Sequence, residues 1–289
     1  IIDIDFGTIT RYTGTLKQAM RQKEANRQTY MKAYANQQRQ ITKTEAYIRK
    51  NKAGTRAKSA RSRQKQLDKM EILTPPQNGK KAKFDFPYVE TTSNLLLQTQ
   101  DLVIGYDQAL VKEAFNFSVG NGEKVAITGF NGIGKTTLLK TLLGQIPPIY
   151  GGFDLSATAK LAYFKQDLTW SNQNMTPLQY LESEFDQKKP KELRQALARM
   201  GLTAQLVMSP LKELSGGEQE KVKLAEMQFE PANLLFLDEP TNHLDNETKD
   251  SLRKAIVNFP GGVIIVSHER DFFRGDWVDK VVDIEAMNN

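Results

Sequence analysis

The sequence predicts an α/β domain, built on a buried β-sheet with helices around it, preceded by a long antiparallel helical hairpin. Three observations support this fold class. Short apolar runs at 124–128, 234–237 and 263–267 are typical of strands buried on both faces of a parallel sheet. A glycine-rich loop follows the first run and leads into a helix-like segment. Finally, Leu16–Lys50 contains no glycine or proline and is rich in Gln, Lys, Arg and Ala, as expected for a helix.

Composition limits the class of protein. The 289 residues have room for one large domain and an appendage, and a hydrophobic content of 39% is enough for a core. The absence of cysteine excludes disulfides and thiolate metal sites. No apolar run approaches the roughly 18–20 residues that cross a bilayer. The first residues also lack the pattern of a secretory signal. We therefore expect a cytoplasmic protein that does not enter the membrane.

The charge is unevenly distributed along the chain. The formal net charge is +6, but residues 15–83 contain 19 Lys and Arg against 4 Asp and Glu. That segment carries +15, so the rest of the chain carries −9. A solvated helical surface is the simpler interpretation of a basic stretch, but an asymmetry of this size favours contact with a polyanion, and nucleic acid in particular.

The first residues predict a strand and a turn. Ile2–Asp5 (IDID) resembles Val282–Glu285 (VDIE) near the other end of the sequence. One copy opens the sequence and the other closes it, which is what a duplicated domain cut after its first copy would leave. We therefore interpret residues 1–14 as the C-terminal remnant of a first domain.

Residues 15–88 predict a helical hairpin and a connector. The first arm, Leu16–Lys50, would reach roughly 50 Å. The second helix would follow a break at Asn51–Thr55, with Thr55 as its cap, and run to about residue 73. Pro75–Gly79 is typical of a linker. The apolar residues that predict a narrow seam between the two arms are Met20, Tyr30, Met31, Tyr34, Ile41, Ile48, Leu67 and Met70.

The predicted hairpin buries little core and suits contact with something at a distance. Its tip and second arm are basic, and such side chains bind phosphates with little reading of sequence. Tyr30, Tyr34 and Tyr47 have two interpretations, stacking on bases or packing in the seam, and their helical spacing favours the seam. The residues we expect to contact nucleic acid are Arg49, Lys50, Lys52, Arg56, Lys58, Arg61, Arg63 and Lys65.

Residues 89–289 predict a compact domain. Strand-like segments occur at 95–99, 114–119 and 124–128, and the turn before the last of these contains Asn121-Gly122. Residues 167–227 are mainly helical in pattern. Two further strands, 234–237 and 263–267, would return the chain to the sheet.

A phosphate-binding loop lies between a strand and a helix. Gly129–Thr137 (GFNGIGKTT) matches the pattern GxxxxGK[ST] in the context that this motif requires. Lys135 would bridge the β- and γ-phosphates, the Thr136 hydroxyl would bind Mg²⁺, and Thr137 lies beside it. The loop residues expected to contact phosphate are Gly129, Asn131, Gly132 and Gly134.

Two carboxylates follow a buried strand. Asp238 can hold Mg²⁺, and Glu239 is the candidate general base for an attacking water. A solvated strand end is the alternative, but the four preceding apolar residues and the following Pro240-Thr241 argue against it. Of the two histidines, His268 follows a strand and is expected to sense the γ-phosphate, whereas His243 lies in a turn. No ligand cluster supports zinc.

A second anion site is predicted at Leu214–Gln219 (LSGGEQ). Ser215 is a favourable N-cap, and two glycines allow close approach to the backbone of a helix N-terminus that suits a phosphate.

These motifs, in their order and spacing, resemble the ATPase domains of the ATP-binding-cassette (ABC) superfamily over roughly residues 95–289. The resemblance implies a P-loop NTPase fold with an antiparallel β part and a helical subdomain, ATP and Mg²⁺ as cofactors, and ATP hydrolysis by two cassettes arranged head to tail. It also implies that Tyr106 stacks on adenine and that Gln166 contacts Mg²⁺ and the water. Ser215 and Gly217 would grip the γ-phosphate of an ATP held by the other cassette.

The TNHLD ending and the basic hairpin resemble the ABC-F branch, which has two cassettes in one chain and no membrane domain. The resemblance implies a ribosome-associated ATPase whose hairpin approaches tRNA and rRNA near the peptidyl-transferase centre. A general translation factor is our leading interpretation, and an antibiotic-resistance factor is the alternative within the branch. The ATPase subunit of a membrane transporter leaves the basic arm unexplained. The expected partners are the ribosome and a first cassette of the same full-length chain, and pairing of this segment with itself stays open.

Overall fold

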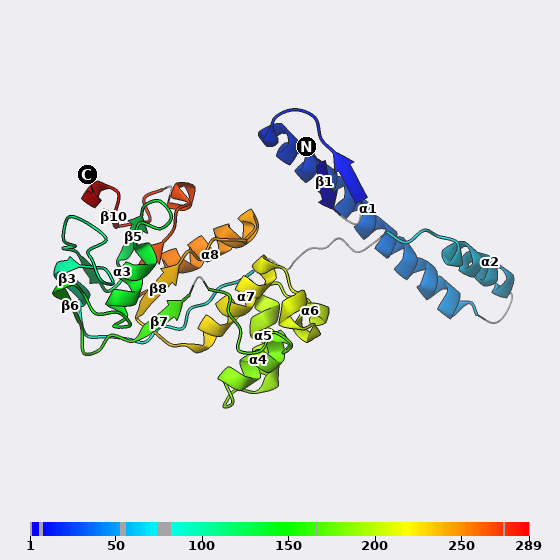
Figure 1. Cartoon of the computed structure of the whole chain (residues 1–289). Coiled ribbons are helices and arrows are strands. Elements are labelled where there is room, and N and C mark those ends of the chain that lie inside the picture. Colours follow the sequence, from blue (N-terminus) through cyan, green and yellow to red (C-terminus); the bar gives the residue numbers. More distant parts are fainter. Residues whose placement is uncertain are drawn as a thin grey trace. The chain divides into compact units, whose positions relative to one another are not determined.

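The computed structural model describes residues 2–5, 8–52, 56–73, 82–165, 167–273 and 275–288. The chain divides into two compact units, Ile1–Asn78 and Gly79–Asn289, which are described separately below (Figure 1). The predicted division into residues 1–14, 15–88 and 89–289 stays a prediction.

The first unit contains a small β-hairpin and two helices. Strands β1 (Ile2–Asp5) and β2 (Thr8–Arg11) pair antiparallel. Helix α1 spans Leu16–Lys50, and α2 spans Ala57–Asp68. Helix α1 begins with a capping box, in which the Thr15 hydroxyl accepts from the Gln18 N–H and the Gln18 side chain accepts from the Thr15 N–H. The first arm therefore has the predicted length.

The two arms form the predicted antiparallel hairpin. Tyr34, Ile41 and Ile48 of α1 are half-buried, and Ala60 of α2 is buried, as expected where two helices pack along a narrow seam. Helix α2 ends at Asp68, earlier than the predicted residue 73. The chain after it is held by Gln37 of α1, whose side chain donates to the Glu71 carbonyl at 2.8 Å and accepts from the Leu73 N–H at 2.9 Å. The predicted break at Asn51–Thr55 begins where α1 ends, with Asn51 as the C-cap. The N-cap of α2 is Arg56, so the predicted Thr55 cap was wrong by one residue. Residues 53–55 and the Pro75–Gly79 linker lie outside the described residues.

The second unit is organised around a five-stranded parallel sheet. Its order is β10-β5-β9-β8-β7, and a separate antiparallel sheet has the order β4-β3-β6. The strands are β3 (Leu95–Val103), β4 (Ser118–Gly120), β5 (Lys124–Thr128), β6 (Tyr150–Leu155), β7 (Leu161–Phe164), β8 (Leu234–Asp238), β9 (Gly262–Val266) and β10 (Lys280–Asp283). The helices are α3 (Lys135–Leu142), α4 (Pro177–Glu184), α5 (Pro190–Arg199), α6 (Ala204–Met208), α7 (Gly216–Glu226) and α8 (Asn246–Asn258).

The parallel sheet is buried on both faces. Successive residues of β8 and β9 alternate between two apolar cores. One core contains the leucines of α3 and the apolar side of the antiparallel sheet. The other contains residues of α4, α5, α7 and α8. Burial on both faces explains why these strands appear in the sequence as continuous apolar runs.

The predicted strands agree with the observed ones except at 114–119. There, only Ser118–Gly120 is a strand. Phe115 pairs with Leu102 as an isolated bridge, while the Asn116 side chain accepts from the Asp101 N–H at 2.8 Å and donates to the Asp101 carboxylate at 3.0 Å. A side chain thus replaces the regular ladder at this point.

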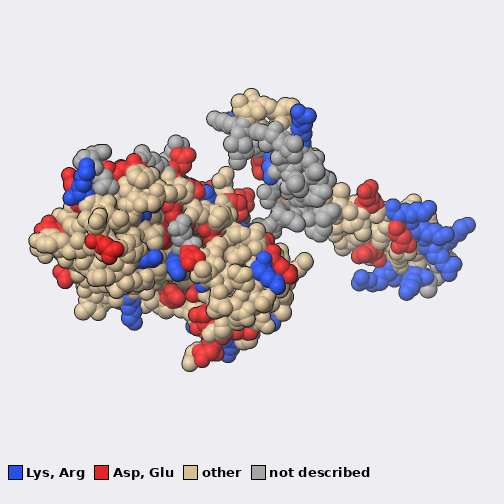
Figure 2. All heavy atoms as spheres, viewed as in Figure 1, with Lys and Arg blue, Asp and Glu red and all other residues tan. Residues whose placement is uncertain are grey.

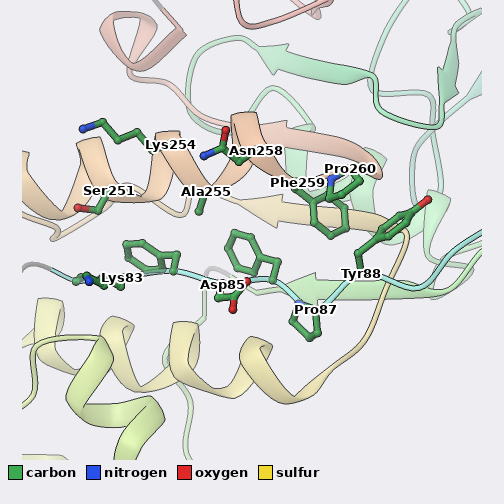
Figure 3. A pocket seen from close by; sticks show the side chains of 13 residues that line it. Lys83, Asp85, Pro87, Tyr88, Ser251, Lys254, Ala255, Asn258, Phe259 and Pro260 are labelled. Carbon is green, nitrogen blue, oxygen red and sulfur yellow. The ribbon is translucent and has the colours of Figure 1, made fainter.

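Residues 82–88 pack on the second unit, so that unit begins before the predicted boundary at residue 89. The Lys83 N–H donates to the Arg199 carbonyl at 2.8 Å, and the Tyr88 and Phe259 rings pack edge to face at 5.7 Å. A hollow of about 650 Å³ lies between this segment and α8. Figure 3 shows the side chains that line it, with Tyr88 and Phe259 at one end. Aromatic packing therefore anchors the connector where sequence composition alone indicated a linker.

Candidate nucleotide-binding site

The phosphate-binding loop joins β5 to α3 at the carboxyl edge of the sheet. Gly134 is the N-cap of α3 with a φ of 114°, and Gly132 has a φ of 87°, so both adopt conformations that favour glycine. A Cβ on Gly129 would lie 2.9 Å from Ile133 Cγ2. The loop and the first N–H groups of α3 therefore form a cradle for an anion, as the motif predicts.

Lys135 lies inside this loop. Its ammonium donates to the Gly129 carbonyl at 2.8 Å and to the Phe130 carbonyl at 3.1 Å. Glu239 Oε1 lies 3.5 Å from the same nitrogen. The lysine is buried, so water screens its charge less and its attraction for phosphate oxygens at this position is stronger than at the surface.

Asp238 ends β8 and is fully buried. Burial is the main cause that raises the pKa of its carboxyl, and a hydrogen bond from Thr136 acts in the opposite direction. Its Oδ2 accepts from Tyr163 at 3.5 Å, whereas Oδ1 has no hydrogen-bond partner among the described residues. A buried carboxylate oxygen without a partner, beside a threonine hydroxyl, fits the oxygen ligands that Mg²⁺ prefers.

Glu239 is held between Lys135 and His268. Its Oε2 lies 2.8 Å from His268 Nδ1 and accepts from the His268 N–H at 3.2 Å. Glu239 is buried and has a φ of 50°, which is uncommon for a residue other than glycine. The structure thus brings the predicted base and the predicted sensing histidine together, with backbone strain of the kind found at functional sites.

The other predicted contacts are less enclosed. Tyr106 is 61% exposed, so its ring is free to stack on a base. It follows Gly105, where a Cβ would lie 2.0 Å from the Gln108 carbonyl oxygen, so a tight turn presents the tyrosine. Thr137 is buried and Asn131 is exposed at the loop surface. Gln166 lies outside the described residues.

The LSGGEQ segment opens α7 as predicted. Ser215 is the N-cap, and its N–H and hydroxyl both donate to Glu218 Oε2 at 2.8 Å. Figure 1 shows α7 among α4, α5 and α6, apart from α3. That Ser215 and Gly217 contact a nucleotide of another cassette stays a prediction.

The contacts that hold α7 in place could not be read from the sequence. Trp170 Nε1 donates to Gln219 Oε1 at 2.7 Å, and Gln219 donates to the Leu214 carbonyl at 2.9 Å. The ammonium of Lys223 lies 4.8 Å from the Trp170 ring centroid and 4.5 Å from that of Tyr180. The sequence hinted at these contacts only through Trp170, one of two tryptophans, because Gln219 and Lys223 lie about fifty residues away from it.

The predicted nucleic-acid contacts lie on the hairpin. Arg49, Lys50, Lys52, Arg56, Lys58, Arg61, Arg63 and Lys65 are all exposed. Figure 2 shows Lys and Arg side chains gathered at the far end of this hairpin. Tyr30 and Tyr34 are half-buried, and the Arg63 guanidinium lies 3.9 Å from the Tyr47 ring centroid. The partial burial of the first two rings and the contact of the third with Arg63 favour packing of the tyrosines over base stacking.

Gly217 shows how α7 depends on the turn that contains His243. A Cβ on Gly217 would lie 2.4 Å from the His243 carbonyl oxygen, whereas a Cβ on Gly216 would lie 3.4 Å from the nearest atom of the His243 ring. We expect Gly217→Ala to lower the free energy of unfolding by about 1–3 kcal/mol, because the backbone of the turn must move. Gly216→Ala is the matched control and should be neutral or stabilising by up to about 1 kcal/mol, as alanine favours helix. Urea denaturation measures both, and equal effects would contradict the close contact.

Glu220 of α7 is a buried carboxylate near the Lys249–Glu269 ion pair, in which Lys249 Nζ lies 2.6 Å from Glu269 Oε1. Its Oε2 has no hydrogen-bond partner among the described residues. Burial raises the pKa of Glu220 to about 8, opposed by Lys249 and assisted by Glu269.

A carboxyl with a raised pKa in the folded state keeps a proton that the unfolded chain releases, so stability falls as pH rises from about 4.5 to about 8. We expect Glu220→Gln to match the wild type near pH 4.5 and to be more stable by about 2 kcal/mol near pH 8. Thermal or urea unfolding across this pH range measures the difference. The exposed Glu247→Gln is the control, and an unchanged pH profile in Glu220→Gln would refute the assignment.

The described residues contain no helix long and apolar enough to cross a membrane. This site combines a phosphate loop, a buried acid and a glutamate–histidine pair at the edge of a parallel sheet. These features define the class of P-loop ATPase domains. Two family models, each described as ABC transporter, match residues 113–242 and 2–86.

The chain is 39% identical to the uncharacterized ABC transporter ATP-binding protein YfmM of Bacillus subtilis, over 94% of this chain and 52% of YfmM. A putative ABC transporter ATP-binding protein from Pyrococcus furiosus has a TM-score of 0.57 and 26% identity, covering 67% of this chain and 99% of its own. The dimeric structure of a post-hydrolysis state of the ATP-binding cassette MJ0796, bound to ADP and Pi, has a TM-score of 0.55 and 19% identity. The match covers 65% of this chain and 94% of the MJ0796 chain.

The chain carries an ATP-binding-cassette ATPase domain and belongs to the ABC superfamily. It spans about half the length of the curated relatives that it matches.

Proposed function

We propose that this chain is the hairpin and one cassette of an ABC-F ATPase that acts on the ribosome as a translation factor in the cytoplasm. The observation that carries the proposal is the attachment of an exposed basic hairpin to a cassette whose catalytic acids, Asp238 and Glu239, are both buried at the phosphate loop. An ATPase domain supplies energy, and the hairpin supplies a surface for a polyanion.

The chemistry proposed for the cassette is hydrolysis of ATP to ADP and phosphate. The loop N–H groups and Lys135 bind the phosphates, and Thr136 and Asp238 would hold Mg²⁺, which neutralises charge on the phosphate oxygens. Glu239 takes a proton from the water that attacks the γ-phosphorus. His268, hydrogen-bonded to Glu239, orients that carboxylate and contacts the γ-phosphate.

The second cassette completes the site in this proposal. Ser215 and Gly217 lie at the exposed N-terminus of α7, where free N–H groups suit the γ-phosphate of an ATP bound to a partner cassette. The dimer of MJ0796, which is similar to this chain in fold, supports pairing of cassettes. A first cassette of the same full-length chain is the proposed partner, and a second copy of this chain is the alternative.

The hairpin is proposed to contact rRNA and tRNA. The eight basic residues at its end are exposed, as phosphate contacts require. An antibiotic-resistance factor that protects the ribosome would use the same surface and is the alternative within this branch. The ATPase subunit of a membrane transporter is the alternative of another class, suggested by the description of the matched families.

Sedimentation separates these alternatives. The longer protein that carries this chain, with Glu239→Gln and ATP, is expected to pellet with ribosomes through a sucrose cushion at low salt. The same protein without nucleotide, and with the Lys135→Ala change, should remain in the supernatant. Flotation with membranes instead of pelleting with ribosomes would overturn the proposal in favour of a transporter.

A further inference from the structure

The hairpin has a hollow whose lining includes only one of the residues predicted to contact nucleic acid. It has a cavity volume of about 420 Å³ and opens between α1 and α2. The residues that line it are Asn36, Arg39, Gln40, Lys43, Thr44 and Arg63. Of these, Arg63 alone belongs to the predicted contact set, so the hollow extends the basic surface along α1.

Three cations converge on this hollow. Arg39 and Lys43 are four residues apart on α1 and therefore share one face of the helix. Arg63 reaches the same hollow from α2. Among the described residues, no carboxylate forms an ion pair with any of the three side chains. Clustered like charges repel one another, and an anion bound between them would relieve that repulsion.

Arg63 is held in place before any ligand arrives. Its guanidinium lies over the Tyr47 ring at 3.9 Å from the centroid, and the Tyr47 hydroxyl donates to Ser59 Oγ at 3.4 Å. A guanidinium restrained in this way loses less conformational entropy on binding, and its planar fork matches the geometry of a phosphate.

The uncharged lining of the hollow is polar. The amides of Asn36 and Gln40 offer N–H donors, while the Thr44 hydroxyl donates to the Gln40 carbonyl at 2.8 Å. Among the described residues, no aromatic, Leu, Ile, Val or Met side chain lines it, so this part of the hairpin offers no platform there for stacking a base. Positive charge with amide donors suits the oxygens of phosphate groups.

We propose that this hollow binds consecutive phosphodiester groups of an RNA strand, with Arg39, Lys43 and Arg63 as the ligating cations. The inference rests on the proposed function, since it gives the RNA a second point of contact on the hairpin. The hollow binds phosphate groups and does not distinguish base sequence. An RNA strand bound there runs along α1, away from the tip of the hairpin.

The test measures binding of a fluorescein-labelled single-stranded oligouridylate to the chain by anisotropy at several KCl concentrations. Arg39→Gln/Lys43→Gln should weaken binding about tenfold and reduce the slope of log Kd against log salt by about 1.4, because two cations that neutralise phosphates are removed. Arg21→Gln/Lys32→Gln removes the same charge from exposed positions of the same helix outside the hollow and should change Kd less than about twofold.

A pair of substitutions at Tyr47 tests the geometry. Tyr47→Phe keeps the ring under Arg63 and should bind RNA as the wild type does. Tyr47→Leu removes the ring and should weaken binding as much as Arg63→Gln does. If the two Tyr47 variants behave alike, Arg63 is not positioned for phosphate by that ring and the proposal fails.

The outcomes separate this inference from the proposed function. Equal weakening by the hollow and control pairs would overturn the hollow, while ribosome pelleting by the wild type would leave the proposed function intact. Displacement of the RNA by pyrophosphate at micromolar concentration would overturn the RNA assignment in favour of a small polyphosphate. Failure of the wild type both to bind RNA at low salt and to pellet with ribosomes would overturn both.

Discussion

Glu239→Gln is expected to reduce ATP hydrolysis by about 10²- to 10⁴-fold while ATP binding is retained. The carboxylate is buried beside Lys135 and His268, where it is placed to accept a proton from water. Glutamine has the same shape and can keep a contact with His268, so the loss falls on proton transfer. Phosphate release under steady-state conditions measures the rate, and a fluorescent ATP analogue measures affinity.

The exposed Glu247→Gln on α8 is the control for this substitution and should hydrolyse ATP at the wild-type rate. Both variants belong in the longer protein, because the proposed site needs two cassettes. Wild-type turnover in Glu239→Gln would show that the general base is another group. A parallel loss of ATP affinity would mean that the substitution disturbs the loop and not the proton transfer.

Neutralising Arg56, Lys58 and Arg61 together is expected to weaken ribosome binding by about 10²- to 10³-fold near physiological salt, with ATP affinity unchanged. All three side chains are exposed on the hairpin, and removing each cation that neutralises a phosphate should lower the salt slope by about 0.7–0.9. Ribosome pelleting over a range of KCl concentrations measures both the affinity and the slope.

The matched control neutralises Lys160, Lys189 and Lys191, which are exposed on the second unit and change the net charge by the same amount. Near-wild-type binding is expected of it. If the control weakens binding as much as the hairpin variant does, the attraction comes from net charge. A drop in ATP affinity in the hairpin variant would show that the arm contributes to the nucleotide site and not to RNA.

Much of the nucleotide site was predictable because its parts are local in sequence. The run Lys124–Thr128, the following glycines and Lys135 form one strand–loop–helix unit, and the structure places each where the motif predicts. Ser215 capping α7 is equally local, since the capping box spans only three residues. The antiparallel hairpin was predictable from the length and composition of its first arm.

The errors occurred where contacts between residues distant in sequence decide the local structure. Helix α2 stops early because Gln37 of α1 binds the backbone that follows it. The strand expected at 114–119 is shortened where the Asn116 side chain pairs with Asp101. The domain begins earlier than expected because aromatic residues of the connector pack beside Phe259. In each case the deciding partner lies far along the chain.

The sequence by itself determined the motifs of this protein: a phosphate loop, two acids after a buried strand, a capped glycine-rich helix start at Leu214–Gln219, and a basic arm on an acidic domain. Periodicity and short-range spacing carry that information. Only the tertiary structure decided that Glu239 adopts a strained backbone between Lys135 and His268. It also decided that the His243 carbonyl excludes a side chain at Gly217, and that Arg39, Lys43 and Arg63 share one hollow. These features depend on packing between distant segments, which the spacing of residues along one segment does not specify.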